Sequence, residues 1–388
     1  MPFDYSRIAA QIDELAREVP RGDPDEFGPL RAAYATLDAA DLVARLSDPR
    51  TRHSWLPARP AASFNRAHPA PAPPDDFSVV ATDGSFILPD RHSPARFYLI
   101  NIGRVHLHYG AAPDAELSSA AELRYREQEL TVDGRIPVNA NLLGMKRAAD
   151  ELAALAAAAE TVPRPAVALQ DGTLILWTLA GQEDVVREWV LGDFLAALDA
   201  LRERGIPVAS YISYPGGKDA MDALRIAACD YPARGRAINC DACRAERDVP
   251  ACAIIPPIPD RHLFAHIAGL APGERSDAYA SASSILRQYG EHAIHFFYLQ
   301  TGAEIARVEV PAWVAADPTH LDLVHAVVYD QCRRGRGYPS VLQEAHEQAV
   351  IHADERRVVE QLVEEALARL GIVMLRSAKD ASKRGRFI

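Results

Sequence analysis

The sequence has 388 residues, which at roughly 150 residues per domain corresponds to two or three domains or to one large domain with additions. Hydrophobic residues make up 48% and charged residues 24%, which excludes a wholly disordered chain, a collagen-like repeat and a coiled-coil rod. The 42 Lys and Arg residues against 53 Asp and Glu residues give a net charge of −11. This balance argues against a generic polyanion binder, because sequence-independent affinity for nucleic acids comes largely from cations that neutralise phosphates.

The expected location of the protein follows from what the sequence lacks. No run approaches the roughly 18 consecutive apolar residues that suggest a membrane span. Residues 1–19 mix acidic and basic side chains and lack the apolar segment of a secretion signal. Five Cys are too few for a disulfide-stapled secreted fold. We therefore expect a cytoplasmic protein that does not enter a membrane.

The first part of the chain divides into a helical and a proline-rich segment. Apolar residues recur at three- and four-residue spacing over residues 4–47, which predicts an N-terminal helical region over residues 1–56. Residues 57–75 contain six prolines, and proline lacks an N–H donor and restricts φ, so this segment is expected to be a linker or an extended strap. The main domain is then expected over residues 76–375, followed by a basic tail over residues 376–388.

From residue 77 onward, strand patterns and helix patterns follow one another. Gly103 and Gly110 are expected to end strands, and the crossover rule makes the central strands parallel. No repeat of 20–50 residues occurs. The predicted elements are strands at 77–88, 97–103 and 104–110, a helix at 141–160, a strand within 165–177, a helix at 183–205, a strand at 206–213, two strands within 295–313 and a helix within 337–355.

Two of the predicted strands contain the same acidic turn. Asp83 is followed by Gly84 and Ser85, and Asp171 is followed by Gly172 and a threonine. A charge inside an apolar strand is costly unless it is paired or binds a metal, and the glycine allows a ligand to approach closely. The alternative is that Asp-Gly is simply a common turn dipeptide. Two copies in the same apolar context favour a functional site over that alternative.

The predicted helix between these strands adds a further pair of carboxylates, Asp150 and Glu151. Glu151 follows Arg147 at i+4, so the alternative is a surface salt bridge of little energetic consequence. If the fourth strand lies beside the first, Asp83, Asp171 and one helix carboxylate can converge. Such carboxylates repel one another unless divalent cations lie between them, and a site of this kind suits two-metal cleavage of phosphodiesters. The predicted fold is therefore α/β, with a ribonuclease-H-like mixed sheet flanked by helices.

The predicted helix within residues 337–355 contains His346. A lone histidine on such a helix is more often structural than catalytic, so the residue alone does not decide its role.

Six segments of the chain follow one another in a characteristic order. They are ATDGS at 81–85, M-K-R-x-x-x-E at 145–151, LQDGTL at 169–174, YIS at 211–213, FFYL with IARVEVPAW within 296–313, and GYP with L-x-E-AHE-x-AVI within 337–351. In this order they resemble the NurA family of DNA end-processing nucleases, and the resemblance runs from about residue 77 to about residue 370.

This resemblance implies an activity and partners. It implies a ribonuclease-H-like core that degrades DNA with Mn²⁺, with Mg²⁺ as the alternative ion, as a 5′–3′ exonuclease and also as a single-strand endonuclease. It further implies a role in DNA end resection and double-strand break repair. The expected partners are DNA, a second copy of the chain in a homodimer, and a hexameric ATPase translocase of the HerA type.

The resemblance also implies site residues. Carried over to this sequence, they are Asp83, Glu151, Asp171 and His346, and Glu151 is favoured over Asp150. Asp83 is expected to bridge both ions, while Glu151 and Asp171 each complete the coordination of one ion. His346 is expected either to bind the second ion or to hold the attacking water or the leaving oxygen.

Four of the five cysteines lie close together in the sequence, as C-x10-C-x2-C-x8-C. They are Cys229, Cys240, Cys243 and Cys252, in an insert over residues 229–256 that is polar and has no apolar periodicity. Four thiolates suit a structural Zn²⁺ or an iron–sulfur cluster, and bound metal would give such a segment a fold. The alternative is four unligated thiols. This insert is not part of the resemblance.

The same insert is rich in arginine. In a nuclease, such cations are natural contacts for phosphates, and Tyr338 is a candidate for stacking on a base. The alternatives are an ordinary solvated surface for the arginines and core packing for the tyrosine. The candidate nucleic-acid-binding residues are Arg234, Arg236, Arg244, Arg247 and Tyr338.

Two other classes of function remain as alternatives. One is a non-catalytic scaffold, stabilised by metal at the cysteines, that binds DNA and the translocase. The other is an ATP-using phosphotransferase on a related core, in which acidic-glycine turns bind a magnesium nucleotide. The sequence lacks a clear glycine-rich adenosine motif, which disfavours the phosphotransferase.

Overall fold

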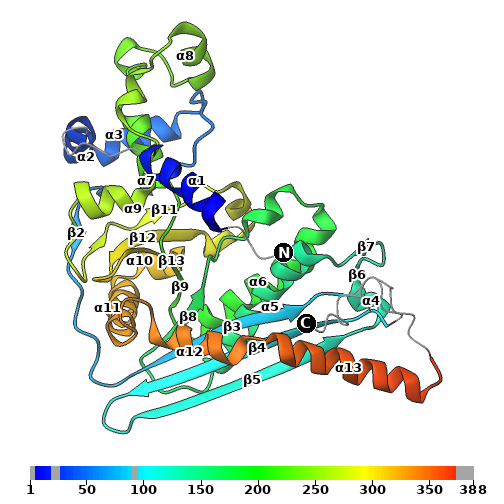
Figure 1. Ribbon diagram of the computed structural model, residues 1–388. Helices are drawn as coiled ribbons and strands as arrows, with labels where there is room; N and C mark the ends of the chain where they lie inside the picture. Colours follow the sequence, from blue (N-terminus) through cyan, green and yellow to red (C-terminus); the bar gives the residue numbers. More distant parts are fainter. Residues whose placement is uncertain (1–4, 19–26, 90–94, 373–388) are drawn as a thin grey trace.

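A mixed sheet runs through the molecule, and helices pack on both of its faces (Figure 1). The computed structural model describes residues 5–18, 27–89 and 95–372. None of the helices in these ranges has the length and apolar character needed to cross a membrane. The strands of the sheet are β1 (Arg59–Pro60), β2 (Ala67–His68), β3 (Phe77–Ile87), β4 (Tyr98–Tyr109), β5 (Asp114–Arg124), β8 (Ala166–Asp171), β9 (Val208–Ile212), β10 (Arg275–Ser276), β11 (Tyr279–Ala280), β12 (Ile294–Gln300) and β13 (Ile305–Pro311).

The helices form two layers and an N-terminal group. A small separate hairpin, β6 (Thr131–Val132) and β7 (Ile136–Pro137), precedes the longest helices. The helices are α1 (Tyr5–Glu18), α2 (Gly28–Ala35), α3 (Ala39–Ser47), α4 (Glu127–Leu130), α5 (Ala140–Ala158), α6 (Asp184–Glu203), α7 (Asp219–Ala227), α8 (Cys240–Glu246), α9 (Asp260–His262), α10 (Ala312–Ala316), α11 (Pro318–Arg334), α12 (Ser340–Ala349) and α13 (Ala353–Arg369).

The order of the strands confirms the predicted ribonuclease-H-like topology. β3, β4 and β5 form an antiparallel meander, and β8 returns after α5 to pair in parallel with β3. β9 follows α6 and pairs in parallel with β8. β13 and β12 then continue the sheet in antiparallel fashion beyond β9. The predicted mixed sheet with the fourth strand beside the first is therefore correct.

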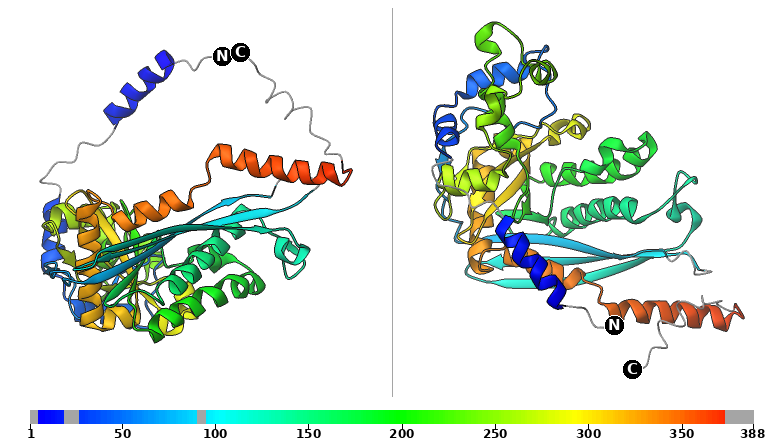
Figure 2. Two further views of the ribbon diagram at one scale, coloured as in Figure 1. Left: turned by 90° about the horizontal axis from the view of Figure 1, so that it is seen from below. Right: turned by 45° about the horizontal axis from the view of Figure 1, so that its top comes forward.

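Alternating side chains of the central strands supply two separate cores. Val80 and Ala168 pack with α5 and α6 on one face, whereas Val79, Ala81 and Leu169 pack with α11 and α12 on the other. A strand buried on both faces requires apolar residues at successive positions, which explains the continuous apolar run of β8. Figure 2 shows α12 and α13 on one side of the sheet and α5 and α6 on the other.

The prediction of the second and third strands was wrong. Residues 97–110 do not form two strands but the single strand β4, and the third strand is β5, which the sequence pattern did not indicate. The residues of β5 are exposed apart from the half-buried last one, so no alternation of apolar residues marks the strand. Gly103 does not end a strand. It lies inside β4, where a Cβ atom would stand 2.6 Å from the backbone nitrogen of Ala349 in α12.

The helices α2 and α3 lie near β1, at the end of the sheet opposite β5. α3 packs on α7, and Leu30 and Leu42 belong to a core shared with that helix. Within residues 57–75, β1 pairs with β11 and β2 pairs with β10, so this proline-rich segment is attached to the sheet at two points. The division into domains stays a prediction. The predicted basic tail at residues 376–388 lies outside the described residues.

Candidate active site

The predicted site residues come from four different elements. Asp83 lies in β3 and Asp171 is the last residue of β8, and the two strands pair in parallel up to the preceding residues. Glu151 is on α5, and His346 is on α12. The Nδ1 atom of His346 is 2.7 Å from Oδ2 of Asp83. Alternation along the strands places Asp83 and Asp171 on the face covered by α12.

Two glycines allow helices to approach β3 and β4 from opposite faces. A Cβ atom on Gly84 would lie 2.5 Å from Oε1 of Glu151, so only glycine leaves room for that carboxyl group. Gly103 provides the same space for the backbone of α12. The hydroxyl of Thr82 donates a hydrogen bond of 2.9 Å to the carbonyl oxygen of Glu151, which fixes α5 against β3. The glycine after Asp83 is therefore required by packing.

Three acidic side chains, Asp83, Glu151 and Asp171, act on one another at this site. Burial raises the pKa of Glu151 to about 8; Arg147 opposes the rise, and Asp83 and Asp171 add to it. Burial also raises the pKa of Asp171, and Asp83 contributes to that rise as well. Nε of Arg147 is 3.3 Å from Oε1 of Glu151, but its Nη1 is 4.0 Å from Asp83. Electrostatic interactions thus link all three carboxyl groups, and one guanidinium only partly balances them.

The arrangement has the donors that a hard divalent cation prefers. Oε1 of Glu151 is buried, accepts no hydrogen bond in the described structure, and is balanced only by the ion pair with Arg147. Three carboxylates and one imidazole suit Mn²⁺ or Mg²⁺ better than a soft metal. Among the residues that the structure describes, however, no group of three or more His, Cys, Asp or Glu side chains is arranged so that it could hold a metal ion.

Tyr338 belongs to this group through a contact that sequence reasoning missed. Its hydroxyl donates a 2.8 Å hydrogen bond to Oδ1 of Asp171, and its ring packs edge-to-face on Tyr211 with centroids 5.3 Å apart. The sequence suggested base stacking for this tyrosine, whereas the structure engages its hydroxyl with a site carboxylate. The sequence feature that could have indicated this contact is the position of the tyrosine, directly before the proline that precedes α12.

A cavity of about 540 Å³ borders Tyr338. The guanidinium of Arg261 lies 4.1 Å above the ring of Tyr214 at this cavity, and Arg336 has a left-handed backbone with φ of 58°. Cations and aromatic rings are the side chains that hold a nucleic-acid strand. The polar and aromatic residues that line the cavity are Tyr214, Arg261, His262, His266, Glu304, Arg336 and Tyr338.

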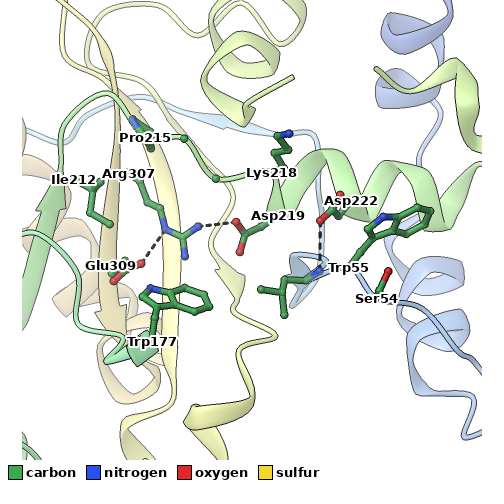
Figure 3. Close-up of a pocket in the computed structure, with 13 residues that line it drawn as sticks. Ser54, Trp55, Trp177, Ile212, Pro215, Lys218, Asp219, Asp222, Arg307 and Glu309 are labelled. Carbon is green, nitrogen blue, oxygen red and sulfur yellow. Dashed lines mark hydrogen bonds and ion pairs between the residues drawn. The ribbon is translucent and has the colours of Figure 1, made fainter. Parts of the chain in front are cut away.

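A second cavity, of about 430 Å³, contains a buried ion network (Figure 3). Arg307 donates to Glu309 at 2.9 Å and to Asp219 at 3.0 Å. Glu309 also accepts hydrogen bonds from the hydroxyl of Thr173 and the backbone N–H of Leu174. The network therefore holds the loop that follows Asp171, a positioning role that the sequence did not indicate. The charged and aromatic side chains around this cavity are Trp55, Trp177, Lys218, Asp219, Asp222, Arg307 and Glu309.

The arginines of the 229–256 insert are paired with acidic residues of the same insert. Asp230, Asp241 and Glu246 accept all four, which reduces the positive charge available to a phosphate. The insert lies at the end of the molecule away from β4 and β5 (Figure 1). Its role in binding DNA stays a prediction. The arginines concerned are Arg234, Arg236, Arg244 and Arg247.

Two solved structures are among those similar to this chain. A crystal structure of NurA with manganese is 12% identical in sequence and covers 93% of this chain and 98% of that chain, with a TM-score of 0.34. A crystal structure of LC9-RNase H1, a type 1 RNase H with the type 2 active-site motif, is 15% identical and covers 50% of this chain and 92% of that chain, with a TM-score of 0.20.

The family assignment rests on sequence. No curated protein matches the chain. The family model of the NurA domain matches residues 77–351, well over half of the sequence, and this range contains Asp83, Glu151, Asp171 and His346. The chain therefore belongs to the NurA family of nucleases.

Proposed function

We propose that this protein is a Mn²⁺-dependent DNA nuclease that shortens DNA ends in end resection and double-strand break repair. The observation that carries the proposal is the position of Asp83, which contacts His346 at 2.7 Å and acts electrostatically on Glu151 and Asp171. A carboxylate at the centre of such a group is suited to holding cations beside a phosphodiester.

The side chains fit the proposed ion. Asp83, Glu151, Asp171 and His346 would hold it, and the buried Oε1 of Glu151, which accepts no hydrogen bond and is paired only with Arg147, supports this assignment. When bound, divalent cations of this kind lower the pKa of a water molecule and stabilise the departing oxygen of a phosphodiester. Mg²⁺ is the alternative ion because it prefers the same oxygen donors.

The protein's own residues orient the reacting groups. The hydroxyl of Tyr338 holds one oxygen of Asp171 and thereby sets the direction of the other. Nδ1 of His346 can donate to Asp83, and Nε2 is then the ring nitrogen that can accept. The side chain of His346 is 60% exposed, so a DNA strand at the surface can reach it. His346 is thus positioned to accept a proton or to hold a water molecule.

The proposed substrate is a DNA strand that passes the cavity beside Tyr338. Arg261 and Arg336 would contact phosphates there, and Tyr214, which is 66% exposed, offers a ring face to a base. The net charge of −11 makes tight unaided binding unfavourable. The proposal therefore includes a HerA-type hexameric ATPase that feeds the strand into a homodimer of this chain, with 5′–3′ exonuclease and single-strand endonuclease activity.

A nuclease assay tests the proposal. Full-length protein, with and without the translocase, is incubated with 5′- and 3′-labelled single- and double-stranded DNA in Mn²⁺, Mg²⁺ or chelator. We expect Mn²⁺-dependent shortening that is lost in Asp83→Asn. Asp114→Asn is the matched control, because Asp114 is an exposed aspartate in β5.

Four outcomes would contradict the proposal. Intact DNA in every metal, or equal digestion by Asp83→Asn and the parent, would remove the basis for the metal site. Translocase binding without cleavage in any metal would favour the scaffold function. ATP turnover by the isolated chain without DNA cleavage would favour a phosphotransferase.

A further inference from the structure

The four clustered cysteines lie on three short elements that follow one another. Cys229 comes two residues after the end of α7, Cys240 and Cys243 lie one turn apart at the start of α8, and Cys252 is in the 3-10 turn η4 (Ala251–Ile254). All four are free thiols, and all are half-buried. η4 packs against α7, so the chain turns back on itself between the first and the last cysteine.

The segment has almost no hydrophobic core of its own. Within residues 229–256, only Tyr231, Ile238 and Ile255 are buried, and neither α8 nor η4 contains a buried residue. Three buried side chains do not offset the loss of conformational entropy of so long a segment. The segment therefore needs a stabilising interaction of another kind.

Polar contacts add to this small core. The hydroxyl of Tyr231 donates to Glu246 at 2.9 Å, and Arg236 pairs with the same Glu246 at 2.7 Å in an exposed ion pair, which contributes roughly 0–1 kcal/mol. Two backbone hydrogen bonds join the segment to Arg52, one to the carbonyl of Ile238 and one from the N–H of Cys240. These contacts fix one side of α8, but they do not connect α8 with η4.

The fold brings the four thiols to neighbouring places. Cys229 and Cys240 pack against the same hydrophobic cluster. Cys243 lies one turn after Cys240 on α8, and η4, which carries Cys252, packs against α7 just before Cys229. The fifth cysteine, Cys332, is fully buried in the main core. The side chains that could close one tetrahedral site therefore come from adjoining parts of the fold.

We propose that Cys229, Cys240, Cys243 and Cys252 bind one structural Zn²⁺ that joins the end of α7, the first turn of α8 and η4. Four thiolates form a closed tetrahedral shell for zinc, and the bound metal supplies the stability that the segment lacks. Among the described residues no group of three or more cysteines is arranged so that it could hold a metal ion. The proposal therefore requires that zinc binding bring α8 and η4 closer to Cys229. This site is independent of the proposed nuclease function.

Zinc is favoured over an iron–sulfur cluster by the surroundings. A cluster of several iron and sulfide ions needs more enclosed space than a single ion, and its potential depends on burial and solvent exposure. All four cysteines remain half-exposed, so solvent would reach a cluster that they held. Zinc has no redox chemistry and is not affected in this way.

The test measures metal content in the full-length protein. The protein is treated with chelator, incubated with Zn²⁺ alone and desalted, and its zinc and iron are measured by mass spectrometry. We expect about one zinc per chain in the parent. Cys243→Ser and Cys252→Ser are expected to lose most of this zinc. Cys332→Ala removes one thiol outside the group and is expected to retain it.

A second measurement covers the case in which the serine variants do not fold. Titration of the parent with Co²⁺ is expected to give thiolate-to-cobalt charge-transfer absorption, and added Zn²⁺ is expected to remove it. Zinc is also expected to slow the reaction of four thiols with a thiol reagent. Equal zinc in Cys243→Ser and the parent, no cobalt band, or an iron–sulfur spectrum would overturn the proposal. A Zn²⁺-loaded protein without nuclease activity would support the zinc site and would contradict only the proposed nuclease function.

Discussion

The carboxyl group of Glu151 is 3% exposed, and its nearest charged neighbours are Arg147, Asp83 and Asp171. Burial of a carboxylate without full compensation favours its protonated form, which explains its pKa of about 8. In the metal-free protein, Glu151 is thus largely neutral at pH 7. Binding of a divalent cation would replace that proton, so a single residue couples metal binding, pH and stability.

The stability of the metal-free protein is expected to fall as the pH rises from about 4.5 to about 8. The pKa of Glu151 rises from 4.5 to about 8 on folding, so the folded state binds the additional proton and loses this advantage when the proton leaves. One pKa unit corresponds to about 1.4 kcal/mol. Glu151→Gln, which resembles the protonated form, is therefore expected to be roughly 4 kcal/mol more stable than the parent at pH 8 and similar to it at pH 4.5. Urea unfolding in chelator measures both differences, and an equal difference at the two pH values would contradict the assignment.

The hydroxyl of Tyr338 is expected to contribute to activity through Asp171. Tyr338→Phe keeps the ring against Tyr211 but removes the 2.8 Å hydrogen bond. A hydrogen bond to a charged group is worth about 1.5–3 kcal/mol, so cleavage is expected to slow by roughly tenfold to a hundredfold. Initial rates of DNA cleavage at saturating Mn²⁺ measure the effect. Tyr125→Phe, at a 58% exposed tyrosine, is the control. Rates within about twofold of the parent would show that the hydroxyl is dispensable.

At the scale of elements, the site depends on how closely α5 and α12 approach the sheet. Gly84 admits the carboxyl group of Glu151 from one face, and Gly103 admits the backbone of α12 from the other. The network of Arg307 and Glu309 holds the loop after β8 in addition. Breaking a buried ion pair of this kind typically costs about 3–5 kcal/mol, so this loop is well fixed. The site residues are thus positioned by packing of the main chain.

Gly103→Ala is expected to displace α12 and His346 with it. The new Cβ would lie 2.6 Å from the nitrogen of Ala349 and 2.8 Å from the carbonyl carbon of Gln348, and neither backbone atom can move independently. Overpacking of this kind costs roughly 1–3 kcal/mol, and we expect nuclease activity to fall together with stability. Urea unfolding and initial rates measure the two effects.

Gly192→Ala is the matched control for that substitution. Gly192 lies inside α6, and a Cβ atom there would meet nothing within 4 Å. Replacing a helical glycine by alanine is expected to stabilise the protein by roughly 0.5–1 kcal/mol without a change in activity. If Gly103→Ala behaved like this control, the close approach of α12 to β4 would not be required.

At the scale of the whole molecule, the net negative charge and the exposed apolar side chains of α13 are the features that bear on the proposed partners. The chain is acidic, and the arginines of the 229–256 insert are balanced by acidic neighbours. α13 has no buried residue, although Val359 and Val363 pack partly against β3 and β4. Its outer side exposes further apolar side chains, which is costly for a surface that stays in water.

The proposed homodimer is expected to use α13. Val358 and Leu362 lie one turn apart on this helix and are 55% and 58% exposed. Val358→Glu combined with Leu362→Glu would bury charge in such an interface, so light scattering is expected to report a monomer instead of a dimer. Val249→Glu changes an equally apolar residue, 75% exposed, in the insert and is expected to leave the dimer intact. A monomeric parent, or a double variant that stays dimeric, would rule out this interface.

The sequence by itself determined the family, the fold class and the order of the central elements. Asp83 and Asp171 were predicted because a charge in an apolar strand is unusual, and a ribonuclease-H-like order with the fourth strand beside the first made their strands neighbours. β5 was not predictable, because an almost fully exposed strand has no apolar alternation. The roles of Asp83, Glu151, Asp171 and His346 as metal ligands stay predictions.

Only the tertiary structure decided which side chains complete the candidate site. Tyr338 and Asp171 are 167 positions apart in the chain, and Thr173 and Glu309 are 136 apart, so no local pattern relates them. Their contacts depend on the packing of α12 and β13 around β8. Sequence periodicity reports which face of an element is buried, whereas the partner across that face is selected only when the whole chain packs.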